Sequence, residues 1–234
     1  FLRNRAVAAD RFQQLLEQLP EFSINRFVAE RPENPAQYGL ASPQRELHLT
    51  DKDGNELHLL FGNESEQGDV YAKLPELPHV FTVAASLDFL DHSAFDLTDK
   101  FVLIINIKNV TELTVSTPEV SYQGRLERTG TSGDDEEAQV SYFFEGQEVE
   151  EDPFKKFYQE IIGLTADSAR PEPVQREPSE DEEKLRIQYT LTGMDVRQLS
   201  AQFVDYDRNF YAVFRDGVSE VLVSKHRIER MLEV

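Results

Sequence analysis

Apolar residues recur at helical spacing in two segments of the chain. In the first segment, the i, i+3, i+4, i+7 spacing of an amphipathic helix is met by Phe12, Leu15, Leu16 and Leu19. About 140 positions later the same spacing is met by Phe154, Phe157, Tyr158 and Ile161. The first stripe predicts a helix over residues 8–19 that ends at Pro20. The second predicts a helix that is capped by Asp152, has Pro153 at its first position and closes at Gly163.

Strand-like segments repeat at nearly the same offset. Residues 69–72 match residues 209–212, and residues 80–83 match residues 220–223. A short helical pattern follows each member of the second pair. A near-constant offset across a helix and several strands indicates a tandem duplication.

The duplication predicts two units, residues 1–95 and 96–234. The second unit has a set of strands, residues 111–149, ahead of its helix, whereas the first begins directly at its helix. If the duplication is complete, we expect about 40–60 residues of matching strands upstream of Phe1. Residues 166–183 are rich in Pro and Glu and predict an exposed connector inside the second unit.

Residues 45–50 and 56–61 alternate between apolar and polar side chains, as two paired strands do. A two-residue turn would put the apolar residues of the two strands on opposite faces. A three-residue loop, with Gly54 in the left-handed region, puts all of them on one face: Leu47, Leu49, Leu57, Leu59 and Phe61. We therefore predict the three-residue loop, and its register places His48 directly across from His58 on the other face.

The remaining pattern predicts further strands and short helices. Residues 34–40 read as a helical turn closed by Gly39, and residues 86–90 as the start of a helix. Residues 22–33 fit no single element. Strands are expected at residues 70–74, 80–83, 101–107, 111–115, 120–129, 139–149, 184–190, 196–204, 210–215 and 219–223, and a last helix at 225–232.

Turn signals organise these strands into antiparallel meanders. Residues 120–129 and 139–149 read as a long hairpin with an acidic tip at 130–137. Asp216 and Gly217 form a hairpin turn in the later meander. The chain is therefore expected to be α+β, with two tandem related units that are each an antiparallel β-meander with flanking helices.

The net charge of −20 narrows the classes of partner. It argues against nucleic acid, because neutralising phosphates requires clustered Lys and Arg. It also argues against docking on anionic lipid. An acidic soluble surface accounts for the charge, and a basic partner or loosely held divalent cations also fit it.

The chain contains no Cys, which excludes disulfides, thiolate chemistry and Cys-type zinc sites. No apolar run approaches the roughly 20 residues that span a bilayer, and the longest, residues 101–105, has the length of a strand. No signal peptide precedes the first helix, so we expect the sequence to be a processed or truncated piece.

Several segments resemble the bacterial family catalogued as "domain of unknown function 4340". The specific parts are Tyr38-Gly39-Leu40, within residues 34–43, and Gly62-Asn63-Glu64, within residues 60–64. Weaker similarity covers residues 70–72, 81–83, 96–100, 157–164 and 207–213, so most of the chain is included.

The resemblance implies an extracytoplasmic module. Members of that family typically carry an N-terminal membrane anchor with the repeats outside the cytoplasm, and some accompany components of ABC-type transport systems. The resemblance carries over no catalytic residue. The anchor is not part of this sequence, so an envelope location is an expectation.

Two motifs suggest metal binding at first sight. Residues 51–56 are acidic around Gly54, but a calcium loop of the EF-hand type needs Gly at its sixth position and Glu at its twelfth, and the twelfth residue here is Gly62. His48 and His58 on adjacent strands could hold a metal ion, with Glu46 as one carboxylate. A metal site needs further ligands, and a solvated cross-strand pair is the default, so we expect no catalytic, cofactor-binding or metal site.

The other candidate features have ordinary structural readings. The acidic runs 134–137 and 180–183 could attract a basic partner or calcium, but are expected to be solvated loops. Aromatic residues near the matched strands could line a recognition groove, but are expected to fill the core: Tyr71, Tyr206, Phe210, Tyr211 and Phe214.

Three functions remain open from the sequence. The first is a non-enzymatic extracytoplasmic interaction module, with a protein partner such as a membrane transport component. The second is a protein that binds a small ligand or polysaccharide in a cleft between the two units. The third is a cryptic hydrolase that uses two converging carboxylates.

Overall fold

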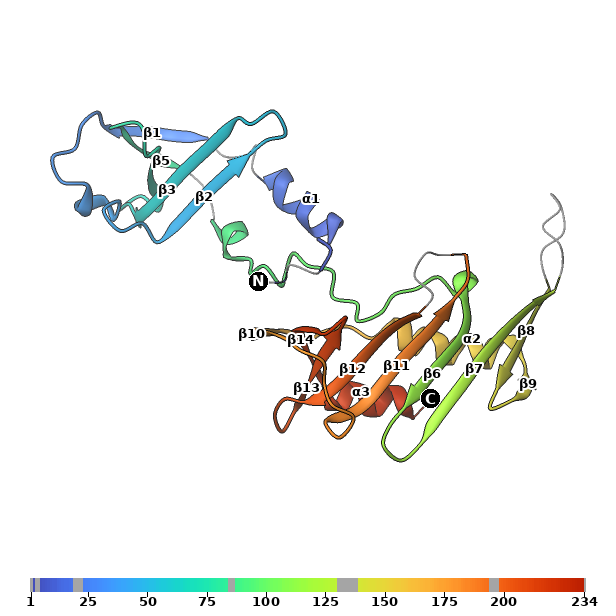
Figure 1. Ribbon diagram of the computed structural model, residues 1–234. Helices are drawn as coiled ribbons and strands as arrows, with labels where there is room; N and C mark the ends of the chain where they lie inside the picture. The colour runs from blue at the N-terminus through green and yellow to red at the C-terminus, as the bar shows by residue number, and fades with distance from the viewer. Residues whose placement is uncertain are drawn as a thin grey trace. The chain divides into compact units, whose positions relative to one another are not determined.

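The computed structural model describes residues 2, 5–18, 23–83, 87–129, 139–193 and 198–233. The chain divides into two compact units, one made of residues 7–97 and the other of residues 98–234 together with residues 1–6 (Figure 1). The described chain is mostly β with three α-helices, and its two antiparallel sheets have five and nine strands, consistent with an α+β fold.

The smaller unit is built on a five-stranded antiparallel sheet. Its strands are β1 (Ile24–Ala29), β2 (Arg45–Thr50), β3 (Glu56–Glu64), β4 (Val70–Lys73) and β5 (Val80–Val83), in the order β1-β5-β4-β3-β2. The core is buried against one face of this sheet and consists of Leu47, Leu59, Phe61, Ala72, Phe81, Val83 and Leu87. Leu15 of helix α1 (Ala9–Gln18) packs against this core, as the first apolar stripe predicts.

The predicted hairpin register of β2 and β3 is confirmed. His48 pairs with His58, and Leu47 pairs with Leu59. The backbone N–H of Asp51 donates to the carbonyl of Asn55 over 2.9 Å, which leaves three residues in the loop. Gly54 has a φ of 84°, in the left-handed region that glycine adopts without steric cost.

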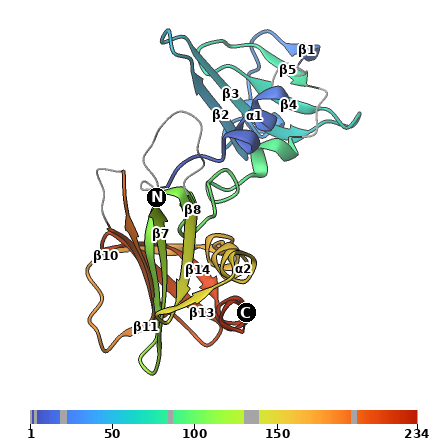
Figure 2. The same cartoon turned by 90° about the vertical axis from the view of Figure 1, so that its right-hand side faces the viewer.

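The larger unit is built on a nine-stranded antiparallel sheet. Its order is β10 (Ser168–Gln175), β14 (Val218–Ser224), β13 (Phe210–Arg215), β12 (Gln198–Asp205), β11 (Glu183–Leu191), β6 (Val110–Ser116), β7 (Ser121–Thr129), β8 (Gln139–Phe144) and β9 (Gln147–Val149). Helices α2 (Glu151–Ile162) and α3 (Lys225–Leu232) cover the same face of the sheet (Figures 1 and 2).

Both helices bury their apolar stripes against this sheet. Phe154, Tyr158 and Ile161 of α2 are buried, and so are Ile228 and Met231 of α3. The sheet contributes fully buried side chains to this core, among them Leu113, Ile187, Tyr189 and Phe203, whereas Phe214 belongs to a separate cluster with Val204, Ala212 and Leu222. Burial of these apolar stripes is the main force that fixes the helices to the sheet.

The two sheets share a strand order. In the smaller unit, the first strand after the helix pairs with the last strand of the meander, giving β1-β5-β4-β3-β2. The larger sheet contains the same arrangement as β10-β14-β13-β12-β11. The difference lies beyond the meander's first strand. β11 continues to β6 and three further strands, whereas β2 is the edge of its sheet.

Two segments expected as irregular turn out to be edge strands. Residues 22–33, which fit no element, contain β1, and residues 166–183, expected to be an exposed connector, contain β10. The expected connector is therefore a strand in part. The Pro residues at 171 and 173 lie between the paired positions Ala169 and Val174, where the register with β14 shifts, and β10 pairs with β14 alone, so both are tolerated.

Other boundaries also differ from expectation. Residues 101–107 form no strand beyond a bridge from Phe101 to Thr165, and their apolar run instead buries Val102 and Leu103 in an irregular segment. Residues 88–91 form a short 3-10 turn rather than the expected helix. Helix α2 begins at Glu151 with Glu150 as its cap, so Asp152 lies inside the first turn.

The expected strand over residues 139–149 is two strands, because Glu145 and Gly146 adopt positive φ values and turn the chain from β8 into β9. The acidic tip expected at 130–137 lies outside the described residues. The later turn is confirmed, with φ of 49° at Asp216 and 71° at Gly217 between β13 and β14.

Candidate functional site

The two most specific motif segments lie against one another. Gly39 ends the 3-10 turn Pro35–Tyr38 with a φ of 73°, and its backbone abuts Asn63. A Cβ on Gly62 would stand 1.9 Å from the carbonyl oxygen of Tyr38. The ring of Tyr38 packs edge-on against that of Tyr71, with the ring centroids 4.9 Å apart. These contacts give the motif residues a role in seating the 34–40 turn on β3.

Each histidine of the pair on β2 and β3 has a carboxylate as its neighbour. The rings of His48 and His58 are 5.1 Å apart between centroids. His58 contacts Glu46 through Nε2, and Nε2 of His48 lies 3.7 Å from a carboxylate oxygen of Glu56. Each imidazole therefore faces its own carboxylate on the exposed side of the sheet, which is the arrangement of a cross-strand pair.

A metal-binding group does not assemble in the described part of the chain. No three His, Asp or Glu side chains there are placed to hold an ion together. His79, His92 and His226 are separate from the pair on β2 and β3, and His226 lies 3.8 Å from Glu229 on its own helix. Among the described residues, no third side chain joins His48 and His58 in such a group, and the expectation of no metal site stays a prediction.

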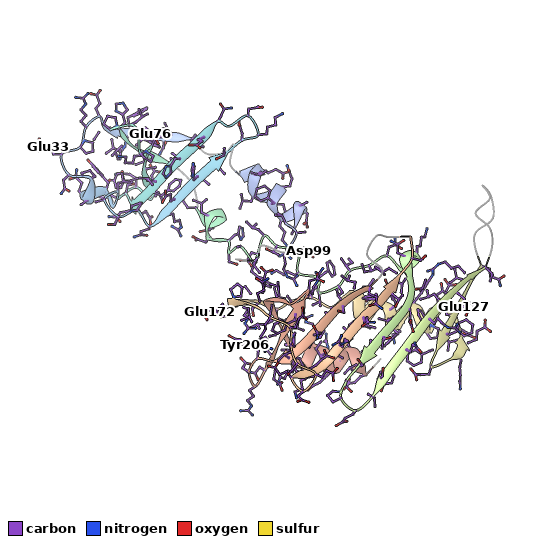
Figure 3. All side chains as sticks on the ribbon, in the orientation of Figure 1. Glu33, Glu76, Asp99, Glu127, Glu172 and Tyr206 are labelled. Atoms are coloured by element: carbon purple, nitrogen blue, oxygen red, sulfur yellow. The ribbon has the colours of Figure 1, made fainter. Side chains whose placement is uncertain are left out.

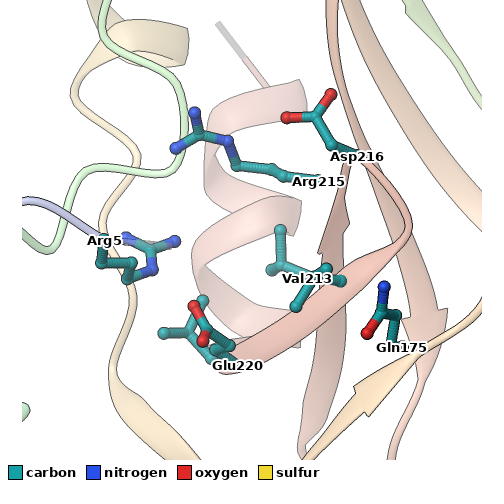
Figure 4. A pocket seen from close by; sticks show the side chains of 8 residues that line it. Arg5, Gln175, Val213, Arg215, Asp216 and Glu220 are labelled. Atoms are coloured by element: carbon teal, nitrogen blue, oxygen red, sulfur yellow. The ribbon is translucent and has the colours of Figure 1, made fainter. Parts of the chain in front are cut away.

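Two arginines meet at a cavity in the larger unit. The cavity has a volume of about 380 Å³, and Figure 4 shows the Arg5 guanidinium between that of Arg215 and the carboxylate of Glu220. Arg215 ends β13, Glu220 lies on β14, and Gln175 comes from the end of β10. Sequence reasoning missed this cluster because its members are far apart along the chain.

Backbone carbonyls hold both guanidinium groups in place. Nη1 of Arg5 donates to the carbonyls of Asp99 and Phe101, each over 3.0 Å. Nη1 of Arg215 donates to the carbonyl of Val102 over 3.2 Å. Arg5 therefore ties the N-terminal segment to the 99–102 segment, which gives it a structural role whatever else it does.

Burial and like charge act on these arginines. Burial lowers the pKa of Arg5, and the neighbouring Arg215 charge lowers it further, while Asp99 and Glu220 oppose the change. Nε of Arg215 is buried with no hydrogen-bond acceptor among the described residues. Glu220 is buried and Asp216 also lines the cavity, so both signs of charge are present. The cluster suits a small polar ligand better than a simple anion.

A second, apolar pocket lies where β7 and β8 meet the helices. Its volume is about 340 Å³, and its lining includes Tyr122, Phe144, Phe157 and Leu232. Tyr122 stacks on Phe144 at 6.2 Å between ring centroids, and Phe144 meets Phe157 edge-on at 5.5 Å. These rings mainly pack the end of the sheet against α2.

The described acidic run at 180–183 is organised by arginines. Glu182 accepts a bidentate pair of hydrogen bonds from Arg176, each 2.7 Å long. Those bonds, with others from Ser179, lower the pKa of Glu182 to about 2. Glu183 is paired in the same way with Arg186. The run at 134–137 lies outside the described residues.

The matched tyrosines have local partners rather than a common groove. Tyr71 packs on Tyr38, and the ammonium of Lys225 lies 4.9 Å from the ring centre of Tyr211. Phe214 is fully buried, whereas Tyr206 is exposed beneath Arg170. Exposed acids such as Glu33, Glu76, Glu127 and Glu172 are spread over both units instead of gathering at one place (Figure 3).

The two outer strands of the smaller sheet, β1 and β2, have backbone groups that pair with no other described strand, and β1 also exposes large apolar side chains. On β1, Phe27 is 69 % exposed and Ile24 is 49 % exposed, although both are large apolar residues. β1 pairs with β5 on one side, and β2 pairs with β3 on one side. Each therefore presents one row of backbone groups away from the sheet.

The comparisons with known proteins give one match. Residues 2–186 match the model of a family described as "Domain of unknown function (DUF4340)". No curated protein and no solved structure matches the chain. Within the described residues, none of the helices combines the length and the apolar character needed to cross a membrane.

Proposed function

The chain belongs to the DUF4340 family, a domain of unknown function, and we propose that it is a non-enzymatic, extracytoplasmic module that binds a partner protein through the open edges of its sheets. The proposal is carried by Phe27. A phenylalanine that is 69 % exposed on an edge strand combines an apolar anchor with free backbone groups, which are the two elements of strand addition.

The shared strand order supports a scaffold made by duplication. A β1-β5-β4-β3-β2 arrangement in one unit and β10-β14-β13-β12-β11 in the other fit two copies of one ancestral unit. The repeat boundaries proposed from the sequence, 1–95 and 96–234, lie within a few residues of the division between the compact units at residues 97 and 98. Duplicated sheets without an assembled metal group among the described residues suit binding or assembly.

The proposed partner and location rest on the family resemblance alone. A component of an ABC-type transport system in the cell envelope is the proposed partner, and an N-terminal anchor outside this sequence is the proposed tether. The net charge of −20 favours a partner with a basic surface over nucleic acid or anionic lipid.

Site-specific photo-crosslinking tests this function. A photo-reactive phenylalanine analogue at residue 27 should form an adduct with one defined envelope polypeptide in living cells. The same analogue at Ile104, which is 53 % exposed in an irregular segment of the larger unit, is the matched control. Residue 27 giving no more adduct than residue 104, or a purely cytoplasmic chain, would contradict the proposal.

A second candidate function is favoured by the arginine cavity. A ligand the size of an amino acid, with a carboxylate near Arg5 and Arg215 and an ammonium near Glu220, would match its charges. A panel of small zwitterions should then raise the unfolding temperature of the wild type but not of Arg215→Gln. The cleft between units and the carboxylate hydrolase stay predictions from the sequence.

A further inference from the structure

The outer edge of β2 occupies a place that is filled in the larger sheet. β2 and β11 are both the first strand of their meander and both end the shared five-strand arrangement. β11 pairs with β12 on one side and with β6 on the other. β2 pairs with β3 alone within the described chain. The protein therefore contains its own example of what covers this edge.

The side-chain patterns of the two strands agree with this equivalence. Leu47 faces Leu59 on β3 and is buried in its core, as Ile187 faces Ala201 on β12 and is buried in the other. Two residues further along, the equivalent of Leu49 is Tyr189. In the larger sheet these two β11 positions are covered from the outer side by β6, because Ile187 pairs with Val115 and Tyr189 pairs with Leu113.

The backbone of β2 is arranged to accept such a strand. Asp51 bonds back to Asn55 across the hairpin, so in an antiparallel ladder the alternate residues Glu46, His48 and Thr50 turn their N–H and C=O groups away from β3. Leu49 is only partly buried and Leu57 is 40 % exposed at the same end of the sheet. Free backbone groups and incompletely covered leucines coincide there.

We propose that β2 is the docking edge for one extended strand of a partner polypeptide, which pairs antiparallel with Glu46, His48 and Thr50 as β6 pairs with β11. This inference rests on the proposed function and names the edge and the kind of strand. Apolar residues of the partner lie opposite Leu47 and Leu49, in the places of Val115 and Leu113.

The polar positions of the partner strand are basic. The exposed face beside this edge carries Glu46 and Glu56, and the adjoining loop carries Asp51 and Asp53 against a single Lys52. A cation opposite these carboxylates steers the encounter and disfavours acidic strands. A suitable probe is a capped heptapeptide that copies residues 110–116 with Glu112→Lys.

Amide hydrogen exchange of the full chain, with and without this peptide, tests the docking edge. At saturation the amides of Glu46, His48 and Thr50 should exchange at least about tenfold more slowly than in the free chain. The exchange rates of the β3 amides should stay unchanged. The pairing of β6 with β7 and β11 turns the amides of Glu112 and Thr114 toward β11. Peptides that are N-methylated at these two positions should lose all protection, and peptides N-methylated at Leu113 and Val115 should retain it.

A proline variant provides a second arm. His48→Pro removes an outward donor without removing a bond to β3, so it should abolish protection while the β3 amides remain protected. The proposal is overturned if the peptide does not protect β2 or if it protects β11 instead. It is also overturned if N-methylation at Glu112 and Thr114 has the same effect as N-methylation at Leu113 and Val115. Protection of β2 that rises with protein concentration alone would assign the edge to a second copy. Protection of the β2 amides without peptide, in a longer polypeptide with residues ahead of Phe1, would assign it to the matching strands expected there. Either result also overturns the proposal. If the edge fails but residue 27 still crosslinks, the proposed function stands.

Discussion

Gly62 lies directly beneath the backbone of Tyr38, so close that a Cβ would stand 1.9 Å from the Tyr38 carbonyl oxygen. A Cβ on Gly39, the next residue along the chain, would stand 2.4 Å from the side-chain oxygen of Asn63 and 2.8 Å from its backbone nitrogen. The two segments on which the resemblance to the family chiefly rested are therefore in contact with each other. Their glycines are required because two stretches of backbone meet there, which is a structural reason for the motif.

The first prediction concerns this contact. Gly62→Ala should lower the free energy of unfolding by about 2–3 kcal/mol, because Tyr38 O is a backbone atom that cannot move aside alone. Chemical denaturation measures the change. Gly54→Ala is the control, since nothing lies within 4 Å of its Cβ position and only its φ of 84° opposes it, at a cost of about 1 kcal/mol. Equal losses in the two variants would show that the close approach is not real.

The second prediction compares two buried tyrosines. Tyr158 donates to the carbonyl of Ile105 over 2.5 Å, whereas the Tyr189 hydroxyl is buried with no partner among the described residues. Tyr158→Phe should therefore cost about 1 kcal/mol in unfolding free energy. Tyr189→Phe should cost nothing or stabilise, because it removes an unsatisfied group. A larger loss for Tyr189→Phe would reveal a hydrogen bond that this account lacks.

The third prediction concerns the stability of the protein at alkaline pH, which depends on the burial of Tyr158. Burial raises its pKa from 10.0 to about 12, so the folded state disfavours the phenolate. The stability contributed by the neutral hydroxyl is complete below the unfolded pKa near 10 and is lost as pH rises through about 12. Unfolding free energies measured from pH 9 to 12 should fall less steeply in Tyr158→Phe than in the wild type. Identical slopes would contradict the burial.

The fourth prediction concerns Asp167, which lies just before β10 and accepts hydrogen bonds at the junction between β14 and helix α3. Burial alone would raise its pKa, but hydrogen bonds from Arg227 over 2.6 Å and from the Ser224 backbone over 2.8 Å outweigh burial and lower it. A lowered pKa means stability that is present above about pH 4 and is lost as pH falls through the folded value. Asp167→Asn should cost about 1–2 kcal/mol at pH 7 and less at pH 3. A cost that does not depend on pH would contradict the ion pair.

The fifth prediction is a titration. The Glu182 carboxylate should titrate near pH 2 by nuclear magnetic resonance, because Arg176 and Ser179 bond to its ionised form. Arg176→Gln should move the midpoint up toward that of an ordinary glutamate. A wild-type midpoint already in the ordinary range would mean that the 180–183 run is a freely solvated loop.

The sequence predicted the parts of the fold in which burial alternates cleanly. The register of β2 and β3, with His48 across from His58, could be predicted because a shift of one residue would expose a whole row of leucines. The sequence-based predictions failed where the position of a strand in the sheet, rather than the alternation of apolar and polar residues, decides which side chains are buried. β1 exposes Phe27 and Ile24 instead of alternating, and β10 carries two prolines in the stretch where its register with β14 shifts.

Long-range convergence explains what the sequence missed at the candidate sites. Arg5 and Arg215 meet only after the N-terminal segment lies along the larger sheet, and no local spacing announces that. The apolar run at 101–107 predicted a strand because burial without a ladder produces the same composition as burial within one. The open edge of β2 became visible only when β11 could be compared with it.

The hydrogen-exchange footprint of the purified chain bound to the polypeptide that crosslinks to residue 27 tests the central claim most directly. The account predicts slowed exchange confined to the edge strands β1 and β2, at Ile24–Ala29 and Arg45–Thr50, with the helices α2 and α3 unchanged. Protection centred on the cavity around Arg215 and Glu220, with both edge strands still exchanging freely, would contradict it.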